Sequence, residues 1–162
     1  MPVVERTITV ALPLDAVWRF LADFTTTEEW DPPTLSTERT SGDGGIGTTY
    51  HNVAKFRGHR TEVDYVVTEY DEGRCLQLRG DATGLEVVDT FLLEPTDAGG
   101  SQVTYSARFT RRVGPEPVDL PSLDVLGDYV AESLQDSLEN LADDPADDPA
   151  DDPADDPAVA DD

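Results

Sequence analysis

The feature that most constrains the fold is one change in the spacing of apolar residues. From Thr34 to Arg112 apolar and polar residues alternate, as they do along β-strands with one buried face. After Pro117 apolar residues recur every three or four positions, which is the period of an amphipathic helix. A sheet with one apolar face has to cover that face, and the chain offers one long helix for this. We therefore expect a curved antiparallel sheet around a C-terminal helix.

Turn residues divide the alternating region into strands. Segments rich in glycine and aspartate separate them, and connections this short require antiparallel hairpins, because a parallel pair needs a long crossover. We expect strands near residues 34–41, 47–56, 59–70, 74–80, 84–94 and 101–112. An earlier alternating run through Val4, Ile8 and Val10 predicts a further strand, which makes about seven in all.

Helical segments lie on either side of this region. Pro13 marks the start of a short helix, and Thr25 to Thr27 can cap a second short helical turn that ends before Pro32. The long helix, of about 20 residues, carries the apolar stripe Leu123, Leu126, Val130, Leu134, Leu138 and Leu141. The fold class is thus α+β. A curved sheet around one helix leaves a gap between them, which is the physical basis for expecting a ligand cavity.

The charge of the chain excludes some partners. The formal net charge is −24, and Lys55 is the only lysine among 11 basic residues. Such a field repels nucleic acid and anionic membranes, so we expect neither as a partner. A surface of this kind stays hydrated in concentrated salt and predicts a halophilic source, although a GC-rich genome favours a similar composition. No apolar stretch approaches about 18 residues and no signal-peptide pattern opens the chain, which predicts a cytoplasmic protein without membrane insertion.

The end of the chain has a different composition. Residues 142–157 are four copies of Ala-Asp-Asp-Pro, in which proline breaks any helix and the aspartates repel one another. We therefore expect residues 1–141 to form one ligand-binding domain and residues 142–162 to form a disordered acidic tail. Solubility in salt is the simplest role for this tail, and docking to a basic partner or weak cation binding are the alternatives.

Four segments carry a family resemblance: Pro13 to Asp23, Glu29-Trp30-Asp31-Pro32, Gly44 to Tyr50, and Leu126-Gly127-Asp128. With them the chain resembles the START-like (SRPBCC) superfamily over about residues 3–141, and within it the polyketide cyclase/dehydrase and lipid-transport group. This resemblance implies the helix-grip fold. The superfamily includes lipid and quinone carriers, aromatase/cyclases and hormone receptors. It shares no common set of catalytic residues, so the resemblance implies none here.

Two motifs are rejected on physical grounds. Gly42 to Gly47 match the dinucleotide fingerprint G-x-G-x-x-G, but a strand rather than a helix is expected after the third glycine, and Asp43 would repel a phosphate. A bulged hairpin turn is the better interpretation. His51 and His59 are the only histidines, and His51 should face solvent by alternation. Neither a metal-binding pattern nor a cofactor motif occurs, so we expect no metal and no cofactor.

The candidate ligand-binding residues are those that alternation and element order direct inward. They are Trp30, Tyr50, Asn52, Phe56, Tyr65, Glu69, Asp89, Phe91 and Tyr105. Rings suit a planar apolar ligand and tyrosine hydroxyls orient it, while ordinary core packing is the alternative for each ring. Asp89 or Glu69 inside a cavity would have a raised pKa, unless solvent or an arginine (Arg79 or Arg108) stabilises its charge.

Three functions remain open at this point. Binding or transport of a hydrophobic small molecule, such as a lipid, quinone or polyketide-like aromatic, follows from the fold and needs no catalytic group. A polyketide cyclase/dehydrase-type enzyme would need an acid and a base in mutual reach, and the sequence shows no such pair. A regulatory or protein-interaction module would use the acidic body and tail. The sequence determines neither the oligomeric state nor any catalytic residue.

Overall fold

The computed structural model describes residues 3–56, 59–82, 85–111 and 120–143. Its elements follow the predicted order of strand, short helices, strands and long helix. They are β1 (Val3–Val10), α1 (Leu14–Ala22), the 3₁₀ turn η1 (Phe24–Thr26), α2 (Thr27–Trp30), β2 (Thr34–Ser41), β3 (Thr49–Phe56), β4 (His59–Asp71), β5 (Cys75–Ala82), β6 (Leu85–Pro95), β7 (Ser101–Arg111) and α3 (Leu120–Asp143).

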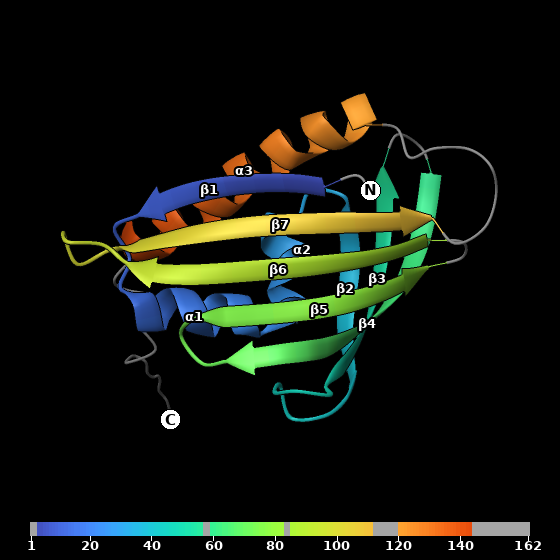
Figure 1. Ribbon diagram of the computed structural model, residues 1–162, viewed down its shortest axis with the longest axis horizontal. Coiled ribbons are helices and arrows are strands. Elements are labelled where there is room, and N and C mark those ends of the chain that lie inside the picture. Colours follow the sequence, from blue (N-terminus) through green and yellow to red (C-terminus); the bar gives the residue numbers. More distant parts are fainter. Residues whose placement is uncertain (1–2, 57–58, 83–84, 112–119, 144–162) are drawn as a thin grey trace, which may run out of the picture.

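The strands form one antiparallel sheet of seven strands in the order β1-β7-β6-β5-β4-β3-β2. In Figure 1, β1, β7, β6 and β5 run along the long axis of the molecule, whereas β2 and β3 stand nearly upright, so the sheet curves strongly. The helices lie behind the sheet in this view. The predicted α+β architecture, a curved sheet that grips the C-terminal helix, is confirmed.

A β-bulge in β4 changes the phase of the alternation. Val67 pairs with Leu78 and Tyr70 pairs with Leu76, so β4 contains one residue more than β5 over this stretch. Tyr70 therefore takes the face that alternation assigned to Glu69, and its ring packs edge-on against Trp18 of α1, with the ring centroids 5.2 Å apart. The prediction that Glu69 faces the interior is wrong: Glu69 is exposed.

Helix α3 packs into the core through the central part of its predicted apolar stripe. Val130, Leu134 and Leu138 are buried, and each contributes about 1.5–3 kcal/mol by burial. Leu141 is 36% exposed and ends the stripe earlier than predicted, while the side chains of Leu123 and Leu126 lie outside the described residues.

The N-terminal half of α3 is held close to β1. A Cβ atom at Gly127 would overlap the side chain of Val4, so only glycine permits this approach. The Arg6 guanidinium also donates from Nε to Oδ1 of Asp128 over 2.7 Å. Together these contacts hold the N-terminal half of α3 against β1.

The short helices carry rings into the interior. The Asp23 carboxylate accepts hydrogen bonds from the backbone N–H of Thr25 at 3.1 Å and from its hydroxyl at 2.6 Å, and so caps η1. Phe24 and Trp30, at either end of the η1–α2 segment, are both buried. The predicted threonine cap belongs to α2, where Thr26 occupies the N-cap position but makes no side-chain capping hydrogen bond.

The glycine-rich loop between β2 and β3 is a turn followed by a strand, as predicted. Gly42, Gly44 and Gly47 have φ values of 95°, 104° and 85°, which side chains rarely tolerate. Since β3 rather than a helix begins at Thr49, the loop lacks the helix N-terminus that binds a pyrophosphate.

Some predicted features involve residues that the structure does not describe. The side chains of Phe56 and His59 and the repeat region from residue 144 onward lie outside the described residues. Ala142 and Asp143, assigned to the predicted tail, still belong to the backbone of α3. None of the helices in the described ranges is long and apolar enough to cross a membrane.

Candidate functional site

An interior cavity of about 190 Å³ lies between the sheet and the helices. Every element from η1 onward except β2 contributes a lining residue, and Asp31 and Pro33 come from the link between α2 and β2. The lining residues are Phe24, Thr27, Trp30, Asp31, Pro33, Asn52, Ala54, Thr61, Val63, Tyr65, Ala82, Leu85, Val87, Asp89, Tyr105, Phe109 and Val130. Most of them are apolar or aromatic, and the polar ones come from different elements.

The structure brings five of the nine predicted residues to this cavity: Trp30, Asn52, Tyr65, Asp89 and Tyr105. Phe91 is fully buried beside it, with its ring centroid 5.7 Å from that of Trp30 and 5.3 Å from that of Tyr105. Phe91 therefore supports the wall rather than lining it. Tyr50 lines a different pocket, described below.

Asp89 is the most deeply buried acid of the cavity, with 6% of its surface exposed. The Tyr105 hydroxyl donates to Asp89 Oδ1 over 3.4 Å. Burial raises the pKa of Asp89 to about 7, with a further rise from the nearby charge of Asp31, whereas the Tyr105 and Tyr65 hydroxyls oppose the shift because they favour the carboxylate. At neutral pH this acid exists in both protonation states.

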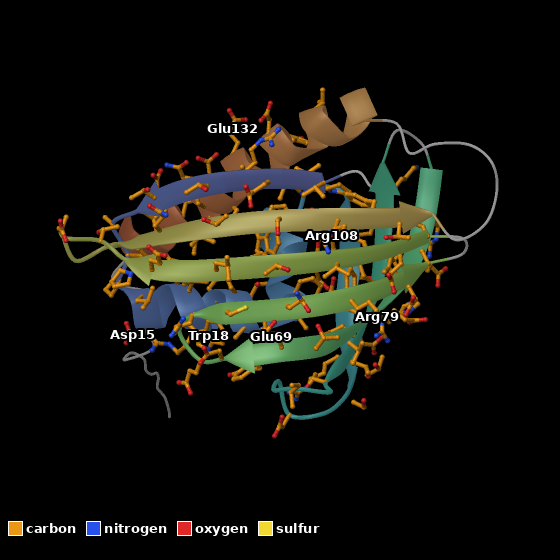
Figure 2. All side chains as sticks on the ribbon, viewed as in Figure 1. Asp15, Trp18, Glu69, Arg79, Arg108 and Glu132 are labelled. Carbon is orange, nitrogen blue, oxygen red and sulfur yellow. The ribbon has the colours of Figure 1, made fainter. Side chains whose placement is uncertain are left out.

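No arginine neutralises Asp89 within the described part of the chain. Instead, Nε of Arg79 lies 3.6 Å from Oδ2 of Asp81 and 3.8 Å from Oε2 of Glu86. Figure 2 shows Arg79, Arg108 and Glu69 on the face of the sheet turned away from the helices. The alternative that Arg79 or Arg108 pairs with Asp89 is thereby removed.

Asp31 is a second carboxyl group of the cavity that sequence reasoning missed. Burial raises its pKa to about 6, and the hydrogen bond from the Thr34 hydroxyl to Asp31 Oδ2, 2.6 Å long, works against this shift. Asp31 stands in the short link between α2 and β2, where no periodicity indicates which way a side chain points. A signal that could have indicated Asp31 is that it directly follows Trp30, a predicted ligand-binding residue.

A buried chain of hydrogen bonds holds Asp31 in place. The Asn52 side-chain nitrogen donates to the hydroxyls of Thr34 at 3.0 Å and Thr37 at 2.9 Å, and Thr34 in turn donates to Asp31. The Thr37 hydroxyl also contacts that of Thr27 at 2.6 Å. The Asn52 side-chain nitrogen therefore makes its hydrogen bonds within the protein.

Tyr65 and Tyr105 act as hydrogen-bond donors in the cavity. Burial, reinforced by the charge of Asp89, raises the pKa of both phenols well above the usual value, so both keep their protons. Gly80, directly across from Tyr65 in the β4–β5 register, makes room for its ring. A Cβ atom at Gly80 would lie 2.6 Å from Tyr65 Cε1 and 2.7 Å from Val63 Cγ1.

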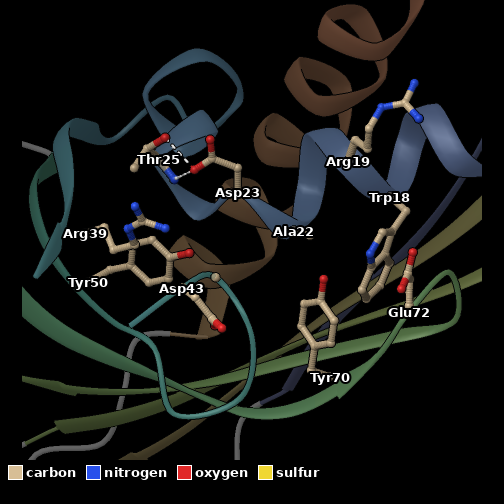
Figure 3. A pocket seen from close by; sticks show the side chains of 11 residues that line it. Trp18, Arg19, Ala22, Asp23, Thr25, Arg39, Asp43, Tyr50, Tyr70 and Glu72 are labelled. Carbon is tan, nitrogen blue, oxygen red and sulfur yellow. Dashed lines mark hydrogen bonds between the residues drawn. The ribbon is translucent and has the colours of Figure 1, made fainter. Parts of the chain in front are cut away.

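A second, open pocket of about 550 Å³ lies outside this cavity, at the end of α1. Figure 3 shows the rings of Trp18, Tyr50 and Tyr70 and the guanidinium of Arg39 around it, together with carboxylates from several loops. Its mixed charge differs from that of the interior cavity, where the ionisable groups are all acids or phenols.

Phe24 separates the two spaces. Its ring lines the interior cavity and packs against Tyr65, with ring centroids 4.9 Å apart. The Phe24 ring also packs against Tyr50, which lines the open pocket, with ring centroids 5.7 Å apart. The Phe24–Tyr50 contact therefore forms part of the wall between the cavity and the open pocket.

The opposite face of the sheet holds His51, as predicted. Its Nδ1 lies 2.7 Å from Asp64 Oδ1 and its Nε2 lies 3.0 Å from Glu62 Oε1. These hydrogen bonds, the one to Asp64 first, raise the pKa of His51. No group of three or more histidine, cysteine or acidic side chains suited to a metal ion occurs among the residues that the structure describes.

Comparison with solved structures supports the helix-grip fold. The aromatase/cyclase Zhui from Streptomyces sp. R1128 aligns with a TM-score of 0.68 and 20% identity over 89% of this chain and 94% of its own. A START superfamily protein from Mycobacterium smegmatis aligns with a TM-score of 0.69 and 15% identity, over 86% and 98% of the two chains. Ara h 8.0201 aligns with a TM-score of 0.65 and 22% identity, over 85% of this chain and 97% of its own.

Sequence comparison identifies the family. No curated protein sequence matches this chain. A family model described as "Polyketide cyclase / dehydrase and lipid transport" matches residues 1–144, which include every element from β1 to α3. The chain therefore belongs to the polyketide cyclase/dehydrase and lipid transport family, as its sequence segments and its fold both indicate.

Proposed function

We propose that this protein binds a small hydrophobic molecule in the interior cavity and holds the polar group of that molecule at Asp89, Tyr65 and Tyr105. The observation that carries the proposal is the convergence of these buried polar groups, from three strands, on a space with mostly apolar walls. Few precisely placed polar groups in an apolar pocket are the general pattern of a small-molecule site.

The size of the cavity narrows the ligand. An apolar cavity of about 150 Å³ holds benzene, whereas pockets for drug-sized ligands measure about 300–1,000 Å³. At about 190 Å³, the cavity suits one ring with a small substituent. Among lipids, quinones and polyketide-like aromatics, the volume favours a compact aromatic compound over an extended acyl chain.

The test compares two neighbouring valines on β6. Val87 lines the cavity, while Val88, one residue on, points to the other face of the sheet. Val87→Phe should fill the cavity and abolish the binding of 4-methylphenol measured by calorimetry. Val88→Phe, the matched control, should bind as the unchanged protein does. Equal binding by both variants would overturn the proposal, provided that circular dichroism shows both to be folded.

An enzyme is the second candidate, because Asp89 has a pKa of about 7 and lies within reach of two phenol donors. Such a carboxylate can accept a proton from a carbon next to a carbonyl group, while Tyr65 or Tyr105 donates a hydrogen bond to the carbonyl oxygen. This chemistry belongs to the same reaction class as cyclisation and dehydration of polyketides.

Hydrogen exchange tests this candidate without knowledge of the natural substrate. In D₂O the protein should accelerate the replacement of the methyl hydrogens of acetophenone by deuterium, followed by NMR. Asp89→Asn should remove the acceleration, and Glu69→Gln, on the exposed face, should keep it. Exchange at the same rate with Asp89→Asn would exclude the acid/base role and leave the binding function standing.

A further inference from the structure

We propose that the cavity selects a compact aromatic amine in its ammonium form and discriminates against aromatic acids. This inference deepens the proposed function and rests on it, since it specifies the charge of the ligand that the same cavity takes. It follows from which ionisable groups line the cavity and from how they are arranged.

The charge inventory of the cavity is one-sided. Its ionisable lining residues are Asp31, Asp89, Tyr65 and Tyr105, and no lysine, arginine or histidine stands among the lining residues that the structure describes. Arg19 and Arg39 line the open pocket instead, beyond the wall formed by Phe24 and Tyr50. Among the residues that the structure describes, no side-chain cation of the wall therefore compensates the negative charge inside the cavity.

Asp89 has acceptor capacity to spare. Only 6% of its surface is exposed. The hydroxyls of Tyr105, at 3.4 Å, and of Tyr65 both interact with its carboxylate, which uses at most two acceptor positions. A carboxylate offers about four acceptor positions, so an ammonium group in the cavity finds unused lone pairs there. Asp31 reaches the same cavity from the α2–β2 link, and the charge of Asp31 acts directly on Asp89.

The aromatic walls complete a site for such a ligand. Trp30 and Tyr105 both line the cavity, with their ring centroids 6.3 Å apart and their ring planes at 76°. Ring faces attract a cation, while apolar neighbours such as Val63 and Val87 contact the ring of the ligand. An aromatic carboxylate would instead place a third negative group beside two acids and lose its hydration without a cationic partner.

Protonation should couple to binding. The titratable groups that face Asp89 are Asp31, Tyr65 and Tyr105, and both phenols keep their protons. Both carboxyl groups titrate near neutral pH, Asp31 at about 6 and Asp89 at about 7. An ammonium ligand therefore binds more tightly as pH rises from 5 to 8, while a neutral alcohol of the same shape shows little change.

Three ligands that differ only in the group on one carbon test the inference: benzylamine, benzyl alcohol and benzoate. At pH 8 and constant ionic strength, calorimetry should show benzylamine binding at least about tenfold more tightly than benzyl alcohol, and benzoate more weakly than both. Asp89→Asn and, separately, Asp31→Asn should reduce the preference for benzylamine and its pH dependence. Glu94→Gln, on the exposed face of β6, should leave both unchanged.

The outcomes separate the two proposals. If benzoate binds as tightly as benzylamine, or if the preference for benzylamine survives in both Asp→Asn variants, the inference is wrong while a ligand-binding cavity remains supported. If none of the three compounds binds and 4-methylphenol also fails, both the proposed function and this inference are overturned.

Discussion

The Tyr105 hydroxyl lies 3.4 Å from Oδ1 of Asp89, and the two residues belong to neighbouring strands. In the β6–β7 register Asp89 pairs with Ala107 and Tyr105 pairs with Phe91, so the two side chains are diagonal neighbours on the inner face. The pairing of β6 with β7 therefore brings an acid and a phenol together without any contribution from the helices. Several consequences of this placement can be measured.

The first prediction concerns stability against pH. The folded-state pKa of Asp89 is raised from 3.8 to about 7, so the folded protein holds a proton that the unfolded chain releases. The free energy of unfolding should consequently fall as pH rises through this window, by at most about 4 kcal/mol from this residue. Asp89→Asn should remove this dependence and be more stable than the unchanged protein at pH 8.

Urea unfolding at pH 4 and pH 8 gives the free energy of unfolding of Asp89→Asn and of the unchanged protein. The difference between the two proteins at each pH measures the effect. Glu94→Gln, an exposed acid on the same strand, serves as the control for the loss of one negative charge. A difference that is the same at both pH values would show that Asp89 does not ionise with a raised pKa.

The second prediction concerns the coupling of the two acids. Asp31→Asn should lower the pKa of Asp89, because it removes a neighbouring negative charge. The pKa should stay above the usual value of an aspartate, since burial is the larger cause of the shift. Carboxyl ¹³C NMR titration of the two proteins gives the result directly. An unchanged Asp89 titration in Asp31→Asn would mean that the carboxyl groups do not interact.

The third prediction concerns the wall at Phe24. Phe24→Ala should connect the interior cavity with the open pocket and admit a two-ring ligand such as 2-naphthol, which the unchanged cavity excludes by size. The loss of a buried ring should cost about 3–5 kcal/mol, so Phe24→Leu provides a milder second variant.

Calorimetry with 2-naphthol measures the gain, and Phe20→Leu controls for the removal of a buried ring that lines neither space. If the folded Phe24 variants bind 2-naphthol no better than this control does, another residue forms the barrier.

The fourth prediction concerns Gly80. Gly80→Ala would place a methyl group against the Tyr65 ring and the Val63 side chain, so the ring must move into the cavity. Overpacking of this kind costs about 1–3 kcal/mol and should weaken ligand binding. The stability loss of the double variant Gly80→Ala/Tyr65→Ala should be smaller than the sum of the single losses, because truncation of the ring removes the clash. Additive losses measured by urea unfolding would argue against contact between these residues.

Residue patterns predicted the strand and helix order well because both depend on local rules. Alternation and turn glycines located each strand to within about two residues, and three residues of the predicted α3 stripe, Val130, Leu134 and Leu138, are buried. The same rules directed Asn52, Tyr65, Asp89 and Tyr105 to one interior. They failed at Glu69, because β4 contains a bulge that arises from its pairing with β5. After the bulge, each side chain of β4 points to the face opposite to the one that simple alternation predicts.

The sequence by itself thus determined the elements, their order and most of the inner face of the sheet. The tertiary structure decided which inward residues share one cavity. Sheet curvature and the η1–α2 segment bring Asp31 beside Asp89, whereas the Phe24 ring separates Tyr50 from them. The physical reason is that alternation is a property of one strand, while a cavity depends on how strands, turns and a helix pack against one another.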